Sequence, residues 1–405
     1  MDRADALQRD AVDELAPFRE RFVFAADEPI YLLGNSLGRQ PATVAARLAD
    51  GLAAWAGTGV AAWDQWMDLP VTVGDRLGQA LLGARPGEVV MADNTTVNPY
   101  KCAAAAIAAR PGRAAIVTDA GNFPTDLYVL QGLARRNGLE LRVVDTDPDG
   151  GSDPEALGRA LRDDVALLSI SLVAFRSAAI ADLAGLTQAA HAAGALTCWD
   201  LSHAVGAIPI DLTGAGADLA VGCTYKYLNG GPGAPAFLYV RGELQPDLSQ
   251  PIQGWFGQRD QFVMGPSYDP FPDARRFLTG TSNVLGLLAV DEGVAVLAEA
   301  GIDRLRAKSV ALGEYAVDLL DSWLAPLGVT LGSPRDASRR GGHLALCHPA
   351  AGTLVGELYR RAGVHVDHRP PDVLRYAFAP AYTRFVDVWD ALDRTRALIA
   401  GEGGW

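Results

Sequence analysis

Lysine is scarce in this sequence. Only Lys101, Lys226 and Lys308 occur among the 35 basic residues, so arginine supplies almost all of the positive charge. Any chemistry that requires a lysine amine therefore has three candidates. The 48 acidic residues give a formal net charge of −13, and the basic residues form no run. Because nucleic-acid binding depends on cationic contacts to phosphate, this balance argues against a nucleic-acid partner.

Long apolar runs and paired cysteines are also missing. No apolar stretch reaches the roughly 18 residues of a membrane span, and residues 1–20 alternate charged and apolar side chains instead of forming the core of a signal peptide. The four cysteines, at 102, 198, 223 and 347, include no C-x-x-C pair, which argues against a disulfide framework or a zinc site. The signatures H-E-x-x-H, G-x-S-x-G and G-x-x-x-x-G-K-[ST] do not occur. We therefore expect a cytoplasmic protein that has no metal and no membrane segment.

Short apolar runs alternate with helical patterns between residues 113 and 240. Buried strands are predicted at 113–118, 139–144, 165–173, 195–199 and 218–224, and helices at 126–136 and 182–193. Ser152, with Glu155 three positions later, is a capping-box pattern that predicts a helix to about residue 161. This alternation predicts an α/β fold with a mostly parallel sheet covered on both faces. Ligands of such sheets bind beyond the carboxyl ends of the strands.

The chain changes character near residue 283. Long helical patterns at 285–298 and 302–324 precede a polar break at 333–342 and a mixed segment that runs to the end. We predict three parts: an N-terminal arm of residues 1–45 that packs on the small domain, a large cofactor-binding domain of residues 46–282, and a smaller α+β C-terminal domain of residues 283–405.

Chemically capable side chains concentrate between residues 198 and 235. The strand that ends at Asp200 is followed by His203, and the next strand leads into Tyr225, Lys226 and the flexible Asn229–Gly233. A lysine at the end of a buried strand is a suitable amine for covalent chemistry with a carbonyl. Asp200 can keep a pyridinium nitrogen protonated. A lysine and an acidic partner are the two groups that pyridoxal phosphate requires.

Each of these features also has an ordinary explanation. Asp200 alone could cap a helix, His203 could be a core residue, the glycines could form a plain turn, and a lone lysine is usually solvated. Their order along the chain and the rarity of lysine favour the cofactor interpretation. Lys308 lies in an amphipathic helix with arginines, which predicts a solvated face, and Lys101 begins an Ala-rich helix without a glycine loop after it.

Two further segments fit the same cofactor. Asn94–Asn98 precedes a helical pattern and offers hydroxyls and N–H groups to a phosphate, although an N-cap cluster has the same composition. Phe123 and Asp126 follow a strand, where an aromatic ring can stack on a cofactor, and an ordinary helix start explains them equally well. His365 and His368 have the spacing of metal ligands, but no third ligand cluster stands nearby.

Several strings of this sequence resemble the kynureninase family. They are YLLGNSLGRQP (31–41), NTTVN (94–98), NFPTDLY (122–128), WDLSHAVGA (199–207), GCTYKYLNGGPGAPAF (222–237) and GWFG (254–257). The resemblance continues in order from about residue 31 to beyond residue 384. That family consists of fold-type-I pyridoxal phosphate enzymes that hydrolyse L-kynurenine to anthranilate and L-alanine, in tryptophan catabolism or NAD biosynthesis. The resemblance implies this fold, cofactor and activity for the present chain.

The resemblance also implies roles for individual residues. Lys226 would hold the cofactor covalently, Asp200 would pair with its ring nitrogen, and Tyr225 would be a further acid or base. The cofactor contacts would be Thr95, Thr96, Phe123, Asp126, Ser171, Asp200, His203, Tyr225 and Lys226, with Trp255 and Thr281 supplied across the interface of a homodimer. The substrate contacts would be Arg375 at the α-carboxylate and Trp63 and Thr281 at the aromatic end, a pair typical of forms that prefer kynurenine to 3-hydroxykynurenine.

The chain departs from the family pattern at two places, where residues 174–178 read AFRSA and residues 380–382 read PAY. The first departure bears on the substrate side of the pocket. The alternative functions are a fold-type-I relative with another substrate, such as a cysteine desulfurase, or a kynureninase-like enzyme of secondary metabolism. A desulfurase requires a mobile catalytic cysteine, and Cys347 is the only cysteine of the predicted small domain. A cofactor-binding regulator without catalysis is a third possibility, which the presence of Arg375 disfavours.

Overall fold

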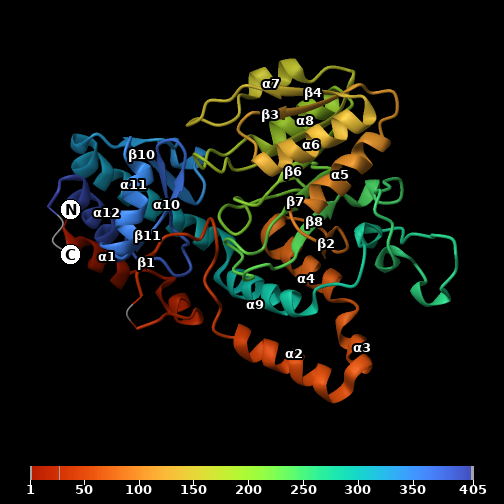
Figure 1. Cartoon of the computed structure of the whole chain (residues 1–405), viewed down its shortest axis with the longest axis horizontal. Helices are drawn as coiled ribbons and strands as arrows, with labels where there is room; N and C mark the ends of the chain where they lie inside the picture. Colours follow the sequence, from red (N-terminus) through yellow and green to blue (C-terminus); the bar gives the residue numbers. More distant parts are fainter. Residues whose placement is uncertain (1, 27, 403–405) are drawn as a thin grey trace.

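A seven-stranded sheet forms the centre of the molecule. The computed structural model describes residues 2–26 and 28–402; residues 1, 27 and 403–405 of the predicted arm and small domain lie outside the described residues. The strand order is β2-β8-β7-β6-β5-β3-β4 (Figure 1). The strands are β2 (Val89–Ala92), β3 (Ala115–Asp119), β4 (Glu140–Val144), β5 (Val165–Ser171), β6 (Leu196–Asp200), β7 (Leu219–Gly222) and β8 (Ala236–Val240). All pairs are parallel except those that β8 makes with β7 and β2, so the predicted mostly parallel sheet is confirmed.

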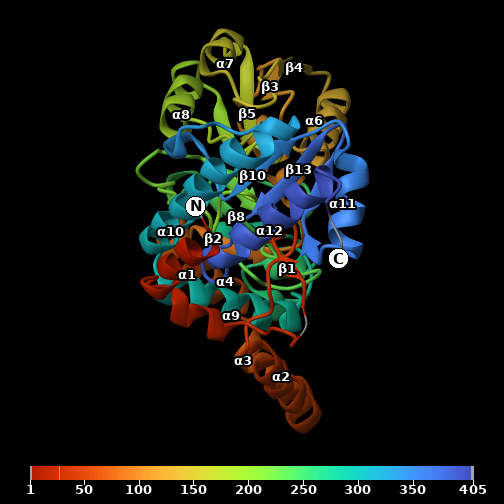
Figure 2. The same cartoon turned by 90° about the vertical axis from the view of Figure 1, so that its left-hand side faces the viewer.

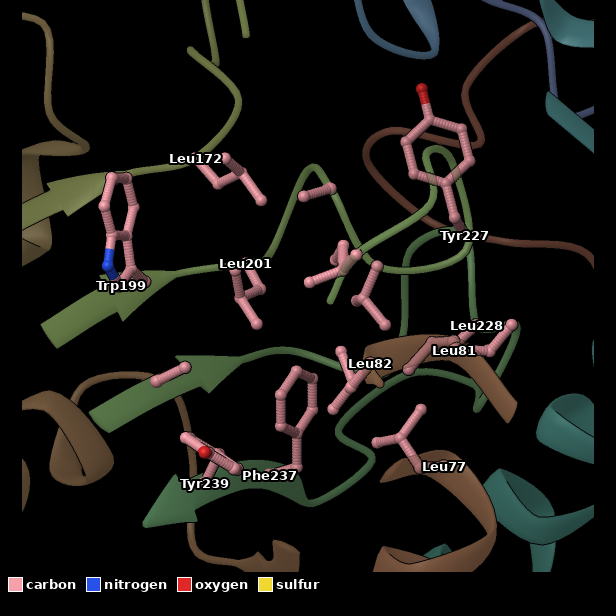
Figure 3. Close-up of a cluster of buried hydrophobic side chains, with 14 of the residues drawn as sticks. Leu77, Leu81, Leu82, Leu172, Trp199, Leu201, Tyr227, Leu228, Phe237 and Tyr239 are labelled. Atoms are coloured by element: carbon pink, nitrogen blue, oxygen red, sulfur yellow. The ribbon is translucent and has the colours of Figure 1, made fainter. Parts of the chain in front are cut away.

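Helices cover both faces of this sheet because its central strands are buried and apolar on both sides. Side chains of α5 (Val97–Ala108) and α6 (Pro124–Asn137) form one apolar cluster with the sheet. The other cluster receives side chains from α4 (Leu69–Leu77), α7 (Pro154–Ala160), α8 (Leu183–Ala192) and α9 (Val284–Ala300). Figure 3 shows part of this second cluster, where Leu77, Leu82 and Phe237 surround a common apolar space. Each such side chain contributes about 1.5–3 kcal/mol of burial free energy.

A second, antiparallel sheet with the order β12-β13-β10-β9 lies beside the first in Figure 1 and in front of it in Figure 2. Its elements are β9 (Thr330–Leu331), β10 (His343–Cys347), β12 (Asp367–Arg369), β13 (Val373–Ala377), α10 (Ile302–Leu319), α11 (Ala351–Arg360) and α12 (Phe385–Ile399). The N-terminal segment packs here, with α1 (Arg3–Ala11) against α12 and β1 (Ile30–Tyr31) paired with β11 (Val364–His365). Helix α9 instead belongs to the cluster of the large sheet. The division into three parts stays a prediction.

Two helices near the start of the chain extend away from the rest of the molecule. They are α2 (Val44–Thr58) and α3 (Trp63–Trp66), and both views show them projecting from one end (Figures 1 and 2). Trp55 on α2 is 64% exposed, and Val60 just after α2 is 83% exposed. Large apolar side chains in such positions are typical of an interface.

The predicted cap of α7 is wrong by one residue. Asp153 is the N-cap, and its carboxylate accepts hydrogen bonds from the N–H groups of Glu155 and Ala156. Ser152 instead donates its hydroxyl to the buried Asp119 at the end of β3. Asp and Ser are equally suitable caps, so the sequence pattern alone could not distinguish two adjacent candidates.

All three lysines are buried, which corrects the predicted solvated face around Lys308. The Lys308 amine pairs with Asp13 of the N-terminal segment at 2.6 Å. The Lys101 amine lies 2.6 Å from Asp93 and donates to the carbonyl of Phe277 at 2.7 Å. Buried ammonium groups require such partners. Both lysines therefore serve the packing of the chain.

The described residues also lack membrane-spanning helices, metal-ligand clusters and disulfides. Among residues 2–26 and 28–402, no helix combines the length and the apolar character that crossing a membrane requires. The same residues contain no group of three or more His, Cys, Asp or Glu placed to hold a metal ion. All four cysteines are free thiols.

Candidate active site

Neighbouring strands bring polar side chains to one edge of the large sheet. Asp200 is the last residue of β6, and the register pairs it with Ser171 at the end of β5 and with Val221 of β7. The chain that leaves β7 continues directly into Tyr225 and Lys226. Because the carboxyl ends of parallel strands meet at the same edge, residues far apart in the sequence come together at this point.

Lys226 lies in the turn that follows β7. The Thr224 hydroxyl closes this turn by donating to the Pro235 carbonyl at 2.7 Å. The Lys226 side chain is nearly buried, and its Nζ lies 3.2 Å from Nε2 of His203 and 5.8 Å from the centre of the Phe123 ring. Burial and the adjacent Lys226 charge hold the pKa of His203 well below its usual value, so this imidazole is neutral at pH 7. The amine thus has a neutral hydrogen-bond partner on one side and an aromatic face on the other.

Two buried carboxyl groups lie next to each other near this amine. Asp126 belongs to the first turn of α6, and Asp200 ends β6. Burial and the neighbouring charge of Asp200 raise the pKa of Asp126 well above its usual value. Asp200 Oδ1 accepts the N–H of Ser202 at 2.7 Å, whereas Asp126 Oδ2 has no hydrogen-bond partner within the described chain. A buried carboxyl pair with an unsatisfied oxygen is suited to a protonated ring nitrogen.

These side chains line one cavity of about 630 Å³, its open mouth included. Its walls are formed by Asn94, Thr95, Thr96, Phe123, Thr125, Asp126, Asp200, Ser202, Tyr225, Lys226 and Ala234. The groups fit pyridoxal phosphate, because an amine for the aldehyde, a ring to stack on, a carboxyl for the ring nitrogen and hydroxyls ahead of α5 for the phosphate surround one space.

Six of the predicted site residues are not among those that line this cavity in the single chain. Of these, His203 lies beside the Lys226 amine, Arg375 is described below, and the other four lie elsewhere. Ser171 donates to Asn122 Oδ1 at 2.7 Å and faces a neighbouring cavity. Trp63 packs edge-on against two other aromatic rings, and Thr281 lines a separate cavity. Trp255 is 41% exposed at the surface. The single chain therefore does not bring these four residues to Lys226.

Arg375 is completely buried in β13 and is held in a fixed orientation. Its Nε and Nη2 donate to the two carboxylate oxygens of Asp367, with 2.6 Å between Nε and Oδ1. Its Nη1 donates to the Phe175 carbonyl at 2.6 Å, and Nη2 also donates to the Ser36 hydroxyl at 3.2 Å. The guanidinium plane is thus fixed by groups from three segments that are distant in the sequence.

The sequence interpretation missed Asp367 and Asn122. Asp367 lies between His365 and His368, which drew attention as metal ligands; His365 instead stacks on a tyrosine ring. The antiparallel register places Asp367 directly opposite Arg375, a pairing that no local pattern reveals. Asn122 was visible only as part of the NFPTDLY string, and its Oδ1 accepts both Ser171 and the N–H of Phe123.

Known structures share this architecture. The cysteine desulfurase CsdA from Escherichia coli superposes with a TM-score of 0.82 at 19% identity, covering 96% of this chain and 99% of that one. A cysteine desulfurase from Thermococcus onnurineus NA1 superposes with a TM-score of 0.80 at 20% identity, covering 92% of this chain and 95% of that one. A C-DES mutant with glycine covalently linked to its pyridoxal phosphate superposes with a TM-score of 0.79 at 16% identity, covering 96% of this chain and 99% of that one. These similarities establish the fold.

The sequence comparisons are more specific. The profile of the kynureninase C-terminal domain matches residues 305–395. Kynureninase from Pseudomonas fluorescens is 41% identical over 399 residues, covering 96% of this chain and 94% of that protein. Kynureninase from Burkholderia pseudomallei (strain 1106a) is 42% identical over 409 residues, covering 99% and 96%.

Together with these kynureninase relatives, the fold and the groups around Lys226 define a fold-type-I enzyme that depends on pyridoxal phosphate. With such identity over nearly its whole length, the chain belongs to the kynureninase family. The predicted fold class, cofactor and family are confirmed.

Proposed function

We propose that this chain hydrolyses the Cβ–Cγ bond of L-kynurenine to release anthranilate and L-alanine, and that Lys226 carries the cofactor. The main support is the nearly buried Lys226 amine, which shares one cavity with an aromatic face and two carboxyls in a member of the kynureninase family. Bound pyridoxal phosphate supplies an electron sink that weakens the bonds at the α-carbon of an amino acid.

Different side chains in and around the cavity bind the cofactor, bind the substrate and transfer protons. Asp200 keeps the proton on the ring nitrogen of the cofactor, Phe123 stacks on the ring, and the Thr95–Thr96 hydroxyls hold the phosphate. Lys226 removes the proton from the α-carbon, and His203, at 3.2 Å, orients the amine for this transfer. Arg375 binds the α-carboxylate and thereby fixes which bond faces the catalytic groups.

Tyr225 is placed to handle protons at the γ-carbonyl of the substrate. Its ring forms part of the cavity wall beside Lys226. Burial raises the pKa of its hydroxyl, so that the group is a protonated donor at neutral pH. It donates to the carbonyl oxygen while water adds to the carbon, and the carbon–carbon bond then breaks to give the acid and the alanine fragment.

The direct test uses the purified holoenzyme with L-kynurenine, 3-hydroxykynurenine and L-cysteine in separate assays. We expect anthranilate fluorescence and equimolar alanine from kynurenine, with a kcat/KM at least about tenfold higher than for the 3-hydroxy compound. Sulfide release from cysteine without anthranilate from kynurenine would instead support the desulfurase alternative.

The position of Cys347 disfavours that alternative. Cys347 ends β10, where it is paired with Val373 on one side and Thr330 on the other. Burial raises the pKa of its thiol, which keeps it protonated. A desulfurase requires a cysteine that is both mobile and deprotonated. Cys347 is held in a paired strand and is protonated, so it has neither property.

We further propose a homodimer in which Trp255 of the partner subunit and Thr281 of the partner subunit complete each cavity. The support is the exposed apolar surface of this chain. Phe262 and Met264, close to its own Trp255, are each 72% exposed, and α2 projects with exposed apolar side chains. Monomeric proteins rarely expose such surfaces. A cytoplasmic location and a place in tryptophan catabolism or NAD biosynthesis belong to the same proposal, and the four free thiols support that location.

Hybrid dimers test the shared site. Lys226→Ala and Trp255→Ala chains are each expected to be inactive, and a hybrid contains one cavity with both defects and one with neither. Unfolding and refolding an equal mixture makes about half of the dimers hybrid, so we expect about a quarter of the wild-type activity. A mixture no more active than its parents, although hybrids are detected by mass spectrometry, would rule out a shared site.

A further inference from the structure

A second buried histidine lies close to the proposed active site. His343 begins β10 and is 1% exposed, and neither of its ring nitrogens has a hydrogen-bond partner within the described part of the chain. The Arg176 carbonyl is near the ring but not in hydrogen-bonding geometry. Because an unsatisfied buried polar group costs about 1–3 kcal/mol, such a ring indicates a partner that arrives with a ligand.

The strand register places this ring on the same face as Arg375. In the antiparallel pair of β10 and β13, Ala345 lies opposite Arg375 and His343 lies opposite Ala377. Since alternate residues of a strand share a face, His343 and Arg375 are diagonal neighbours on one side of the small sheet. That side lies close to Lys226, because the His343 ring centre is 6.0 Å from that of His203, whose Nε2 lies 3.2 Å from the Lys226 amine.

The start of β10 lies very close to the turn that contains Lys226. A side-chain carbon on Gly342, the residue before His343, would lie 2.8 Å from the hydroxyl oxygen of Tyr227, which directly follows Lys226. The start of β10 therefore packs against the turn that carries the catalytic lysine, without room for a side chain at position 342.

The hydrogen bonds of Arg375 leave it too few free N–H groups to satisfy a substrate carboxylate, so a second donor would be needed. A guanidinium has five N–H groups, and four of those on Arg375 are engaged with Asp367, Phe175 and Ser36. One N–H remains for a substrate carboxylate, which has two oxygens to satisfy. The Asp367 carboxylate also neutralises much of the arginine charge, so the carboxylate of the substrate gains from another hydrogen-bond donor on the same face.

Burial and the nearby Arg375 lower the pKa of His343 to about 3, so the ring is neutral at pH 7. A neutral imidazole has one N–H donor and one acceptor nitrogen. It can therefore give a hydrogen bond to a carboxylate without introducing a further buried charge.

We propose that His343 is a substrate-binding residue that donates a hydrogen bond to the α-carboxylate held by Arg375. This inference rests on the proposed function for the identity of the substrate, but the recognition it describes applies to any α-amino acid that enters the cavity. Its effect is on the binding and orientation of the amino-acid end, while the cofactor itself is held by other residues.

The test measures ligand binding to the holoenzyme of His343→Phe, which replaces the ring without its nitrogens, and of His343→Gln, which keeps a donor and an acceptor. The probe is L-alanine, titrated by the change that it causes in the visible absorption of the cofactor. Ethylamine, which has the same amine but no carboxylate, is the control ligand. We expect His343→Phe to bind L-alanine about 10- to 100-fold more weakly, with ethylamine and cofactor affinity unchanged. His343→Gln should stay within about threefold of the wild type.

A matched control is Tyr376→Phe. Tyr376 is next to Arg375 on β13 but pairs with Leu344 on the opposite face, and its buried hydroxyl bonds to Thr395 at 2.8 Å. This variant should lose thermal stability and keep its affinity for L-alanine. If His343→Phe does not fold, His343→Leu takes its place.

Two results would overturn the proposal. One is an unchanged L-alanine affinity in His343→Phe, and the other is an equal loss of affinity for L-alanine, ethylamine and cofactor, which would indicate a packing role. A wild-type enzyme that binds L-alanine but does not cleave kynurenine would refute the proposed function and leave the role of His343 intact.

Discussion

Lys226→Ala is expected to abolish kynurenine cleavage, with a loss in kcat of about 10⁴-fold or more, equivalent to about 5.5 kcal/mol. The variant loses both the covalent link to the cofactor and the amine that moves the α-proton. The other two lysines cannot replace it, because Lys101 and Lys308 are held by carboxylates elsewhere in the fold. Borohydride reduction followed by peptide mass spectrometry checks the assignment directly. The wild type should carry the cofactor mass on the peptide that contains Lys226, and the variant should carry none.

Lys308→Met is the matched control for this experiment. Lys308 is as buried as Lys226 but pairs with Asp13, which lies in the N-terminal segment. Breaking this pair leaves a buried carboxylate and should lower the melting temperature, while the reduced cofactor should remain on Lys226. Cofactor found on another residue of the wild type, or anthranilate production by Lys226→Ala, would contradict the assignment of Lys226.

Asp200→Asn is expected to lower kcat about a thousandfold, or about 4 kcal/mol, without preventing the fold. The amide is nearly isosteric, and its oxygen can still accept the Ser202 N–H that the carboxylate accepts now. It cannot, however, keep a proton on the ring nitrogen of the cofactor, so the electron sink weakens. Steady-state kinetics with kynurenine measures the loss, and the circular dichroism spectrum and the cofactor content show whether the site is still assembled.

Asp119→Asn provides the comparison for Asp200. Asp119 is also a buried carboxyl at a strand end, on β3, but it bonds to Ser152 and lines a different cavity. Its replacement should change kcat less than about threefold. Equal losses in the two variants would show that the effect comes from disturbed strand ends and not from the pairing of Asp200 with the cofactor.

Five of the seven strands of the large sheet could be predicted from the sequence, because buried parallel strands form short apolar runs between helical patterns. The antiparallel pair β2 and β8 at one edge of the sheet was not predicted. Asp200 and Lys226 were accessible for a related reason, since the edge where parallel strands end is fixed by the topology. The exact cap of α7 was not accessible, because Ser152 and Asp153 are chemically equivalent candidates. The burial of Lys308 was hidden as well, since its partner Asp13 lies almost 300 residues away in the sequence.

The surroundings of Arg375 were harder to predict, because they depend on strand pairing and on contacts between segments far apart in the sequence. Arg375 was predicted from the family resemblance, but its partner Asp367 lies on a neighbouring strand, and the carbonyl of Phe175 comes from the other sheet system. His343 carries no local signal, because a single histidine at the start of a strand is usually a core residue. Only the pairing of β10 with β13 shows that it shares a face with Arg375.

The burial of the lysines has a consequence for the reactivity of the whole protein toward aldehydes. The exposed fractions of Lys101, Lys226 and Lys308 are 0%, 8% and 8%, so the described surface presents almost no ε-amine to solvent. An aldehyde cofactor reacts with amines wherever it meets them, but here two of the three ε-amines are engaged as cations with carboxylates. Arginine instead supplies the positive charge of the surface, and its guanidinium does not readily form adducts with aldehydes. If Lys226 carries the cofactor as proposed, we expect loading to be directed to this site, because the described surface offers the aldehyde almost no competing ε-amine.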